Sequence, residues 1–85
     1  MNENASSVAN SITYHVQPRL IRQNLHMSQR EFSTAFGIPL STLQNWEQGR
    51  RKIDSTSASF LRTINQIPNE VRQALQTFKA EQLLA

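Results

Sequence analysis

The side chains best suited to chemistry in this sequence gather just after residue 40. Ser41, Gln44 and Asn45 carry hydroxyl and amide groups, which donate and accept hydrogen bonds, and the apolar Leu40 shares their helical face. Three consecutive cations, Arg50–Lys52, follow them. These groups are suited to binding the polar edges and the negative charges of a partner.

Catalytic chemistry finds no support in the residue types or their spacing. The chain has no cysteine, and His15 and His26 lie far apart, with no ligand or nucleophile spacing around either. The six acidic residues are scattered, and two glycines cannot form a glycine-rich phosphate loop. We therefore expect a protein that is not an enzyme and that holds no metal and no cofactor.

The positive charge of the chain is concentrated in one segment. Residues 19–52 contain six basic and two acidic side chains, whereas the charges of residues 53–85 balance. A surface that binds phosphate groups needs such a local surplus, although a net charge of +3 is small in itself.

Two short helices must position these side chains. Apolar residues recur at helical spacing before Gly37, and again between residues 40 and 48, where Leu43 and Trp46 face inward. Two short helices joined by a glycine-containing turn are the layout of a helix-turn-helix, whose second helix can lie in the DNA major groove.

The remaining patterns predict an all-α fold of five helices. Ser28 and Glu31 have the spacing of a capping box, and either Asp54 or Ser55 caps the fourth helix. Pro68 breaks the fourth helix and opens the fifth. The expected helices cover about residues 18–25, 28–37, 40–48, 54–67 and 68–83, with the helix-turn-helix at 28–48 and the whole domain at 18–85.

Residues 1–17 are expected to form a flexible N-terminal arm. Ile12, Tyr14 and Val16 alternate with polar residues, which predicts a short half-buried strand over 12–16. A lone strand is unstable in water, so the segment pairs with a second subunit, adds to another partner, or is only extended. The arm has no secretory signal pattern and the chain has no membrane span, so we expect a cytoplasmic protein.

Residues 21–49, IRQNLHMSQREFSTAFGIPLSTLQNWEQG, resemble the Xre/Cro-type helix-turn-helix of phage repressors and bacterial regulators. A longer stretch, residues 21–75, is similar to antitoxins of the HigA type, through TLQNWEQGRR and the later IPNEV. The resemblance implies a lambda-repressor-like fold, binding to double-stranded DNA, and a bacterial protein that is nucleoid-associated when bound.

The resemblance also assigns base-reading positions. In this family the first exposed residues of the second helix of the motif, and one residue a turn later, reach base edges; these fall on Leu40, Ser41 and Asn45, with Gln44 as a fourth candidate. Asn45 can pair with adenine and Ser41 with several bases, whereas Leu40 can contact only apolar groups such as a thymine methyl. Phage repressors often carry Gln at the position of Leu40, so this chain departs from the pattern there.

Further roles follow for phosphate contacts and for one ion pair. Gln29 near a helix N-terminus, the Thr42 hydroxyl and Arg50–Lys52 are the expected phosphate contacts. An Arg in the first helix pairs in the family with the Glu that closes the third, and these residues are Arg22 and Glu47 here.

Three hypotheses for the role and the partners of the protein follow. The protein is an antitoxin and autorepressor that binds a small RelE/HigB-like toxin through its arm, a stand-alone phage or plasmid repressor, or an interaction adaptor that has lost DNA binding. The basic segment and the polar helix face argue against the adaptor. We expect a homodimer on an inverted-repeat operator. The apolar stripe of the helix over 68–83, extended by Leu83 and Leu84, is the first candidate for the dimer surface; the alternatives are that this stripe packs on the first and fourth helices, and that the N-terminal arm forms the interface.

Overall fold

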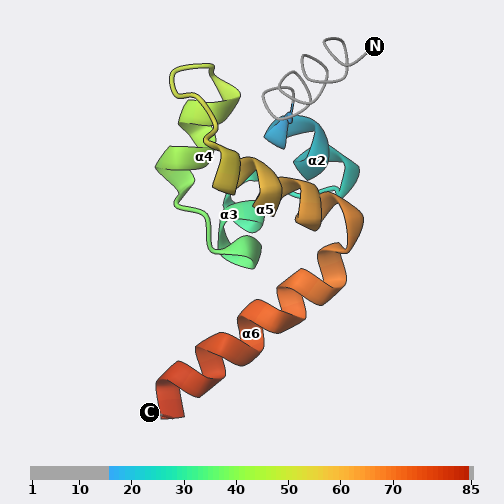
Figure 1. Ribbon diagram of the computed structural model, residues 1–85, viewed down its shortest axis with the longest axis vertical. Helices are drawn as coiled ribbons and strands as arrows, with labels where there is room; N and C mark the ends of the chain where they lie inside the picture. The colour runs from blue at the N-terminus through green and yellow to red at the C-terminus, as the bar shows by residue number, and fades with distance from the viewer. Residues whose placement is uncertain (1–15, 85) are drawn as a thin grey trace, which may run out of the picture.

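Five helices make up residues 16–84, the part of the chain that the computed structural model describes (Figure 1). They are α2 (Pro18–Asn24), α3 (Gln29–Phe36), α4 (Leu40–Glu47), α5 (Ser55–Gln66) and α6 (Pro68–Leu84). No strand occurs within these residues, which confirms the predicted all-α fold. Of the strand predicted over 12–16, residues 12–15 lie outside the described part, and Val16 is half-buried with no strand assignment.

Local capping chemistry sets the start of α3 and of α5. The Ser28 hydroxyl accepts a hydrogen bond from the Glu31 N–H at 3.0 Å, and the Glu31 carboxylate accepts one from the Ser28 N–H at 2.7 Å. This reciprocal capping box satisfies two helix-terminal donors, as the sequence predicts. Between the two caps expected for α5, Asp54 is the one used, and it accepts from the Ser57 N–H at 2.7 Å.

Left-handed residues set the ends of α2 and α3. Gly37 follows α3 with φ of 66°, and His26 follows α2 with φ of 57°. The Met27 N–H donates to the Arg22 carbonyl and the His26 N–H to the Gln23 carbonyl, which is the pair of bonds of a Schellman motif. A non-glycine residue therefore occupies a position where glycine is the unstrained choice.

All five helices contribute to one hydrophobic core. The rings of Phe32 and Phe36 lie 4.9 Å apart at its centre, and α3 packs against both α4 and α6. Each fully buried side chain of this size stabilises the fold by roughly 1.5–3 kcal/mol. The buried members of the core are Ile21, Phe32, Phe36, Ile38, Leu43, Leu61, Ile64 and Val71.

Helix α6 extends well beyond this core. Its first turns carry Val71 and Leu75 against the other helices, and the rest of the helix runs away from the body (Figure 1). Phe78 lies two turns after Val71 on the same face, yet 56% of its surface is exposed. Leu83, nearer the end, is 87% exposed. None of the helices within residues 16–84 is both long enough and apolar enough to span a membrane.

Candidate functional site

The turn between α3 and α4 is fixed by buried side chains and by hydrogen bonds. Ile38 is 5% exposed, its N–H donates to the Ser33 carbonyl at 3.2 Å, and the Ser33 hydroxyl donates to the Ile38 carbonyl. Pro39 is the N-cap residue of α4, and Leu43 of α4 is fully buried. The angle between α3 and α4 is therefore held by the core.

The outer face of α4 presents the predicted polar side chains together. Ser41 is exposed and Gln44 and Asn45 are half-buried, on the side of the helix opposite Leu43. Leu40 and Thr42 are both half-buried and lie toward the two flanks of this face. Within residues 16–84 no hydrogen bond engages the side chains of Ser41, Gln44 and Asn45.

The basic segment Arg50–Lys52 follows α4 directly, and all three of its side chains are exposed. Gly49 has φ of 73°, a left-handed turn that a residue with a Cβ rarely adopts. The Arg50 N–H then donates to the Asn45 carbonyl at 2.9 Å. The backbone at the start of the loop is thus tied to the last turns of α4, and the cations follow the C-terminal end of that helix.

A partly buried ion pair between Arg22 and Glu47 holds the C-terminal end of α4 against α2. Arg22 donates from Nε to Glu47 Oε2 and from Nη2 to Glu47 Oε1, both at 2.8 Å. The Glu47 side chain is 1% exposed and that of Arg22 is 14% exposed. Arg22 Nη1 also donates to the Met27 carbonyl at 3.1 Å, which ties the pair to the turn that ends α2. The structure thus places Arg22 and Glu47 in contact, the two residues that the resemblance to the Xre/Cro family indicates as an ion pair.

Two further donors converge on the same carboxylate. Gln29 donates from Nε2 to Glu47 Oε1 at 3.0 Å, so part of its amide already binds within the protein. Arg19 donates from Nε to Glu47 Oε1 at 3.4 Å and from Nη2 to the Glu47 carbonyl at 3.2 Å. The sequence reasoning missed Arg19, although its position one turn before Arg22 on the same face was a usable signal.

Electrostatics favours the ionised form of this network. Burial by itself would raise the pKa of the Glu47 carboxyl, but hydrogen bonds from Arg22, Gln29 and Arg19, with the charge of Arg22, outweigh burial and lower that pKa. The hydrogen bond to Glu47 raises the pKa of Arg22 in turn, against the opposing effect of burial. Both side chains are therefore charged at neutral pH.

Potential metal ligands are not clustered in the part of the chain that the structure describes. No group of three or more His, Asp or Glu side chains within residues 16–84 lies close enough to hold a metal ion. Polar binding and charge are what the surface of α4 and its loop provide.

Comparisons with known proteins agree with this geometry. The family profile described as helix-turn-helix, HTH_3, matches residues 19–61, which run from α2 into α5. Among solved structures, an HTH XRE-family like protein from Agrobacterium tumefaciens is similar, with 40% sequence identity and a TM-score of 0.66. The similarity covers 67% of this chain and 92% of that chain. No curated protein matches the sequence.

Proposed function

The chain belongs to the Xre-type helix-turn-helix family, whose domain binds DNA, and from this we propose that it is a sequence-specific transcriptional repressor acting as a homodimer. One observation carries the proposal: a buried carboxylate fixes α4 with its polar face outward, and three exposed cations follow the end of this helix. Base edges need the first feature, and backbone phosphates need the second.

We assign base reading to the outer face of α4. Asn45 can donate to and accept from one adenine, Ser41 can bond several bases, and Gln44 extends the same row of polar groups. Leu40 contributes apolar contact only, so thymine is the base that it favours. The half-buried state of Leu40 supports a role at the flank of the interface rather than at its centre.

Phosphate contacts are assigned around the two ends of the motif. The amide nitrogen of Gln29 has two N–H groups, so one can bind a phosphate while the other remains on Glu47. The Thr42 hydroxyl and the exposed Arg50–Lys52 side chains complete the set. These contacts position α4 without specifying sequence.

A second copy of the chain is the partner that we assign to α6. Val71 and Leu75 are used by the core, but the exposed Phe78 continues their face beyond the body. Pairing of α6 helices across a two-fold axis would bury it and present two α4 helices to half-sites about one turn of DNA apart.

A role as the antitoxin of a RelE/HigB-like ribonuclease is a second candidate. Leu20, half of whose surface is exposed, lines a pocket of about 260 Å³ with Val16 and Ile21. Its other lining residues, Gln17, Asn24, Arg62 and Asn65, are polar, so the hollow joins an apolar patch to hydrogen-bonding groups. It lies where residues 16–17 lead into α2, and we take it as support for a protein-binding role on that side of the domain. Co-expression with a neighbouring reading frame of toxin size tests the idea: a stable complex that removal of residues 1–17 abolishes is expected, and no complex rejects the antitoxin role.

The main proposal is tested by selecting bound fragments from the host genome and measuring their affinity. Asn45→Ala should relax preference at one base position in each half-site, by about 1–3 kcal/mol of discrimination. Asn65→Ala is the matched control, because Asn65 is an exposed Asn on α5. Equal affinity of the wild-type protein for selected and scrambled fragments would refute the proposed function.

A further inference from the structure

A pocket of about 580 Å³ opens between the start of α2, the end of α4 and the basic loop. Three cations line it from two separate segments: Arg19 from α2, and Arg51 and Lys52 from the loop. Trp46 and Ile53 form apolar parts of the wall. Arg50 does not line the pocket, so only two of the three loop cations, Arg51 and Lys52, belong to it.

The charge of the residues that line this pocket is net positive. Glu47 is its one acidic lining residue, and the Glu47 side chain is 1% exposed and bound twice by Arg22 at 2.8 Å. Because Arg22 already neutralises that carboxylate, the charge of Arg19 remains in excess alongside those of Arg51 and Lys52. Asp54, two residues after Lys52, caps α5 through the Ser57 N–H, and the charge of Arg51 also helps to lower the pKa of Asp54. Arg51 is therefore partly balanced by Asp54, whereas no acidic side chain other than Glu47 lines the pocket.

Contacts with Glu47 position the Arg19 side chain but leave most of its N–H donors available for a ligand. Its contact with Glu47 Oε1 is 3.4 Å long, and 54% of its side chain is exposed. A planar guanidinium has five N–H donors, of which the structure engages two. The Arg19 Nη2 bond to the Glu47 carbonyl also places a cation at the C-terminal end of α4, where the helix dipole would otherwise repel an anion.

Arg19 is also continuous with a position already assigned to phosphate. Gln29 and Arg19 both donate to the same oxygen, Glu47 Oε1. Arg19 therefore shares a carboxylate oxygen with Gln29 and shares the lining of the pocket with Arg51 and Lys52. The pocket includes Trp46 and Glu47 of the last turn of α4, which directly follow Asn45 of the proposed base-reading face.

We propose that this pocket is a phosphate subsite for the DNA backbone, in which Arg19 is a phosphate-binding residue together with Arg51 and Lys52. The inference rests on the proposed function, since it takes DNA as the ligand. It adds a contact from α2 to those of α3 and the loop. It also distinguishes Arg50 from Arg51 and Lys52, because a phosphate bound by Arg50 would lie outside the pocket.

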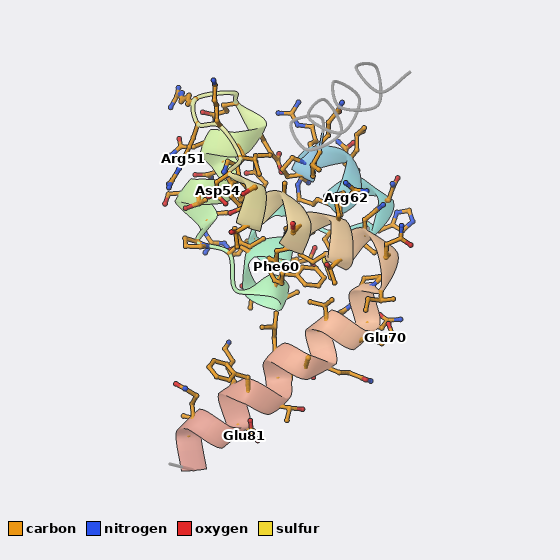
Figure 2. The ribbon with its side chains drawn as sticks, in the orientation of Figure 1. Arg51, Asp54, Phe60, Arg62, Glu70 and Glu81 are labelled. Carbon is orange, nitrogen blue, oxygen red and sulfur yellow. The ribbon has the colours of Figure 1, made fainter. Side chains whose placement is uncertain are left out.

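The test is the salt dependence of binding to a duplex, measured by fluorescence anisotropy for wild type, Arg19→Gln and Arg19→Lys. Loss of one phosphate contact lowers the slope of log affinity against log salt by about one, equally for selected and unrelated duplexes. Arg19→Gln is expected to show this loss, and Arg19→Lys to restore the slope because it keeps the charge. Arg62→Gln is the matched control, since Arg62 is exposed on α5 and lies far from Arg51 (Figure 2).

Melting temperatures separate binding from a structural role. An unchanged slope for Arg19→Gln, with a lowered melting temperature, would make Arg19 only a cap of α4 and overturn the proposal. Stabilisation of the free protein by inorganic phosphate that depends on Arg19, with an unchanged DNA slope, would make the pocket a small-anion site and also overturn it. Failure of the wild type to prefer any fragment would instead refute the repressor function, while the slope measured on unrelated duplex would still decide the subsite.

Discussion

At the scale of single residues, the least expected conformation belongs to His26. It adopts φ of 57° because the chain must leave α2 through a left-handed position to form its two closing hydrogen bonds. For a residue with a Cβ this conformation costs about 1–2 kcal/mol. The same kind of position after α3 is filled by Gly37, at which an added Cβ would meet nothing within 4 Å.

Replacing His26 by glycine should stabilise the protein. Relief of the left-handed strain exceeds the added entropy of the unfolded chain, about 0.5–1 kcal/mol, so the free energy of unfolding should rise by roughly 0.5–1 kcal/mol. Chemical denaturation measures the change. Gly37→Ala is the converse variant and should lower stability by about 1 kcal/mol. A destabilised His26→Gly would show that the imidazole makes a contribution beyond its backbone.

Acid should destabilise the fold through three carboxylates. Hydrogen bonds from the backbone N–H of Ser28 lower the pKa of Glu31, and those from Ser57 lower the pKa of Asp54, while Glu47 is lowered by its donors against the effect of burial. A group whose pKa is lower in the folded state stabilises the protein above its unfolded pKa, which is 4.5 for Glu47, and loses this contribution as the pH falls through the folded pKa.

The melting temperature should therefore stay level near neutral pH and fall below about pH 4.5. A pH series of thermal melts checks this, with the double variant Glu31→Gln, Asp54→Asn isolating the share of Glu47. A flat profile down to about pH 3 would show that the three carboxyls titrate alike in the folded and unfolded states.

At the scale of elements, the position of α4 depends on one carboxylate. Glu47→Ala removes a side chain that is 1% exposed and leaves Arg22 without its partner, which costs roughly 3–5 kcal/mol. For a domain of this size that loss lowers the melting temperature by about 4–8 °C for each kcal/mol. Glu81→Ala on the exposed end of α6 is the control and should melt like wild type. Normal stability of Glu47→Ala with altered base preference would contradict this structural role.

The elements also show what the sequence could and could not predict. Ser28, Glu31, Gly37 and Pro68 act on their immediate neighbours, so capping and breaking rules were enough to place the helices that they bound. The hydrogen bonds that Gln29 and Arg19 donate to Glu47 depend on how α2 and α3 pack against α4. Residues 18 and 28 positions apart are brought together there, so the helical spacing that puts Arg19 on the face of Arg22 could suggest its contact with Glu47 but not establish it, and no local pattern indicates the contact of Gln29.

At the scale of the whole molecule, α6 separates into a packed start and a free end. Figure 2 places Glu70 beside the body and Glu81 near the far end of the helix. The length of the helix was predicted to within a residue from Pro68 and the apolar repeat. The extension of α6 away from the body was not predicted, because the same apolar repeat is expected of a helix that packs against the core along its whole length.

We expect Phe78→Glu to prevent dimer formation without unfolding the protein. Phe78 is 56% exposed, so a charge there costs little in a monomer but a great deal in a helix pair. Sedimentation at several concentrations would show a wild-type dimer and a monomeric variant, with weaker binding to an inverted repeat. Gln76→Glu places the same charge on the opposite face of α6 and should remain dimeric. Dimers that persist in Phe78→Glu would move the interface elsewhere.

The shared carboxylate of Glu47 has a consequence for the motions of the protein. Because α2, α3 and α4 all meet at this one group, α4 cannot open alone without stranding a buried charge, so its opening is coupled to global unfolding. Hydrogen exchange should give the central amides of α4 the full protection of the core, while amides past Phe78 exchange quickly. The surface that we propose to contact DNA would then be rigid before binding, and the conformational entropy lost on binding would come from the exposed loop cations rather than from α4 itself.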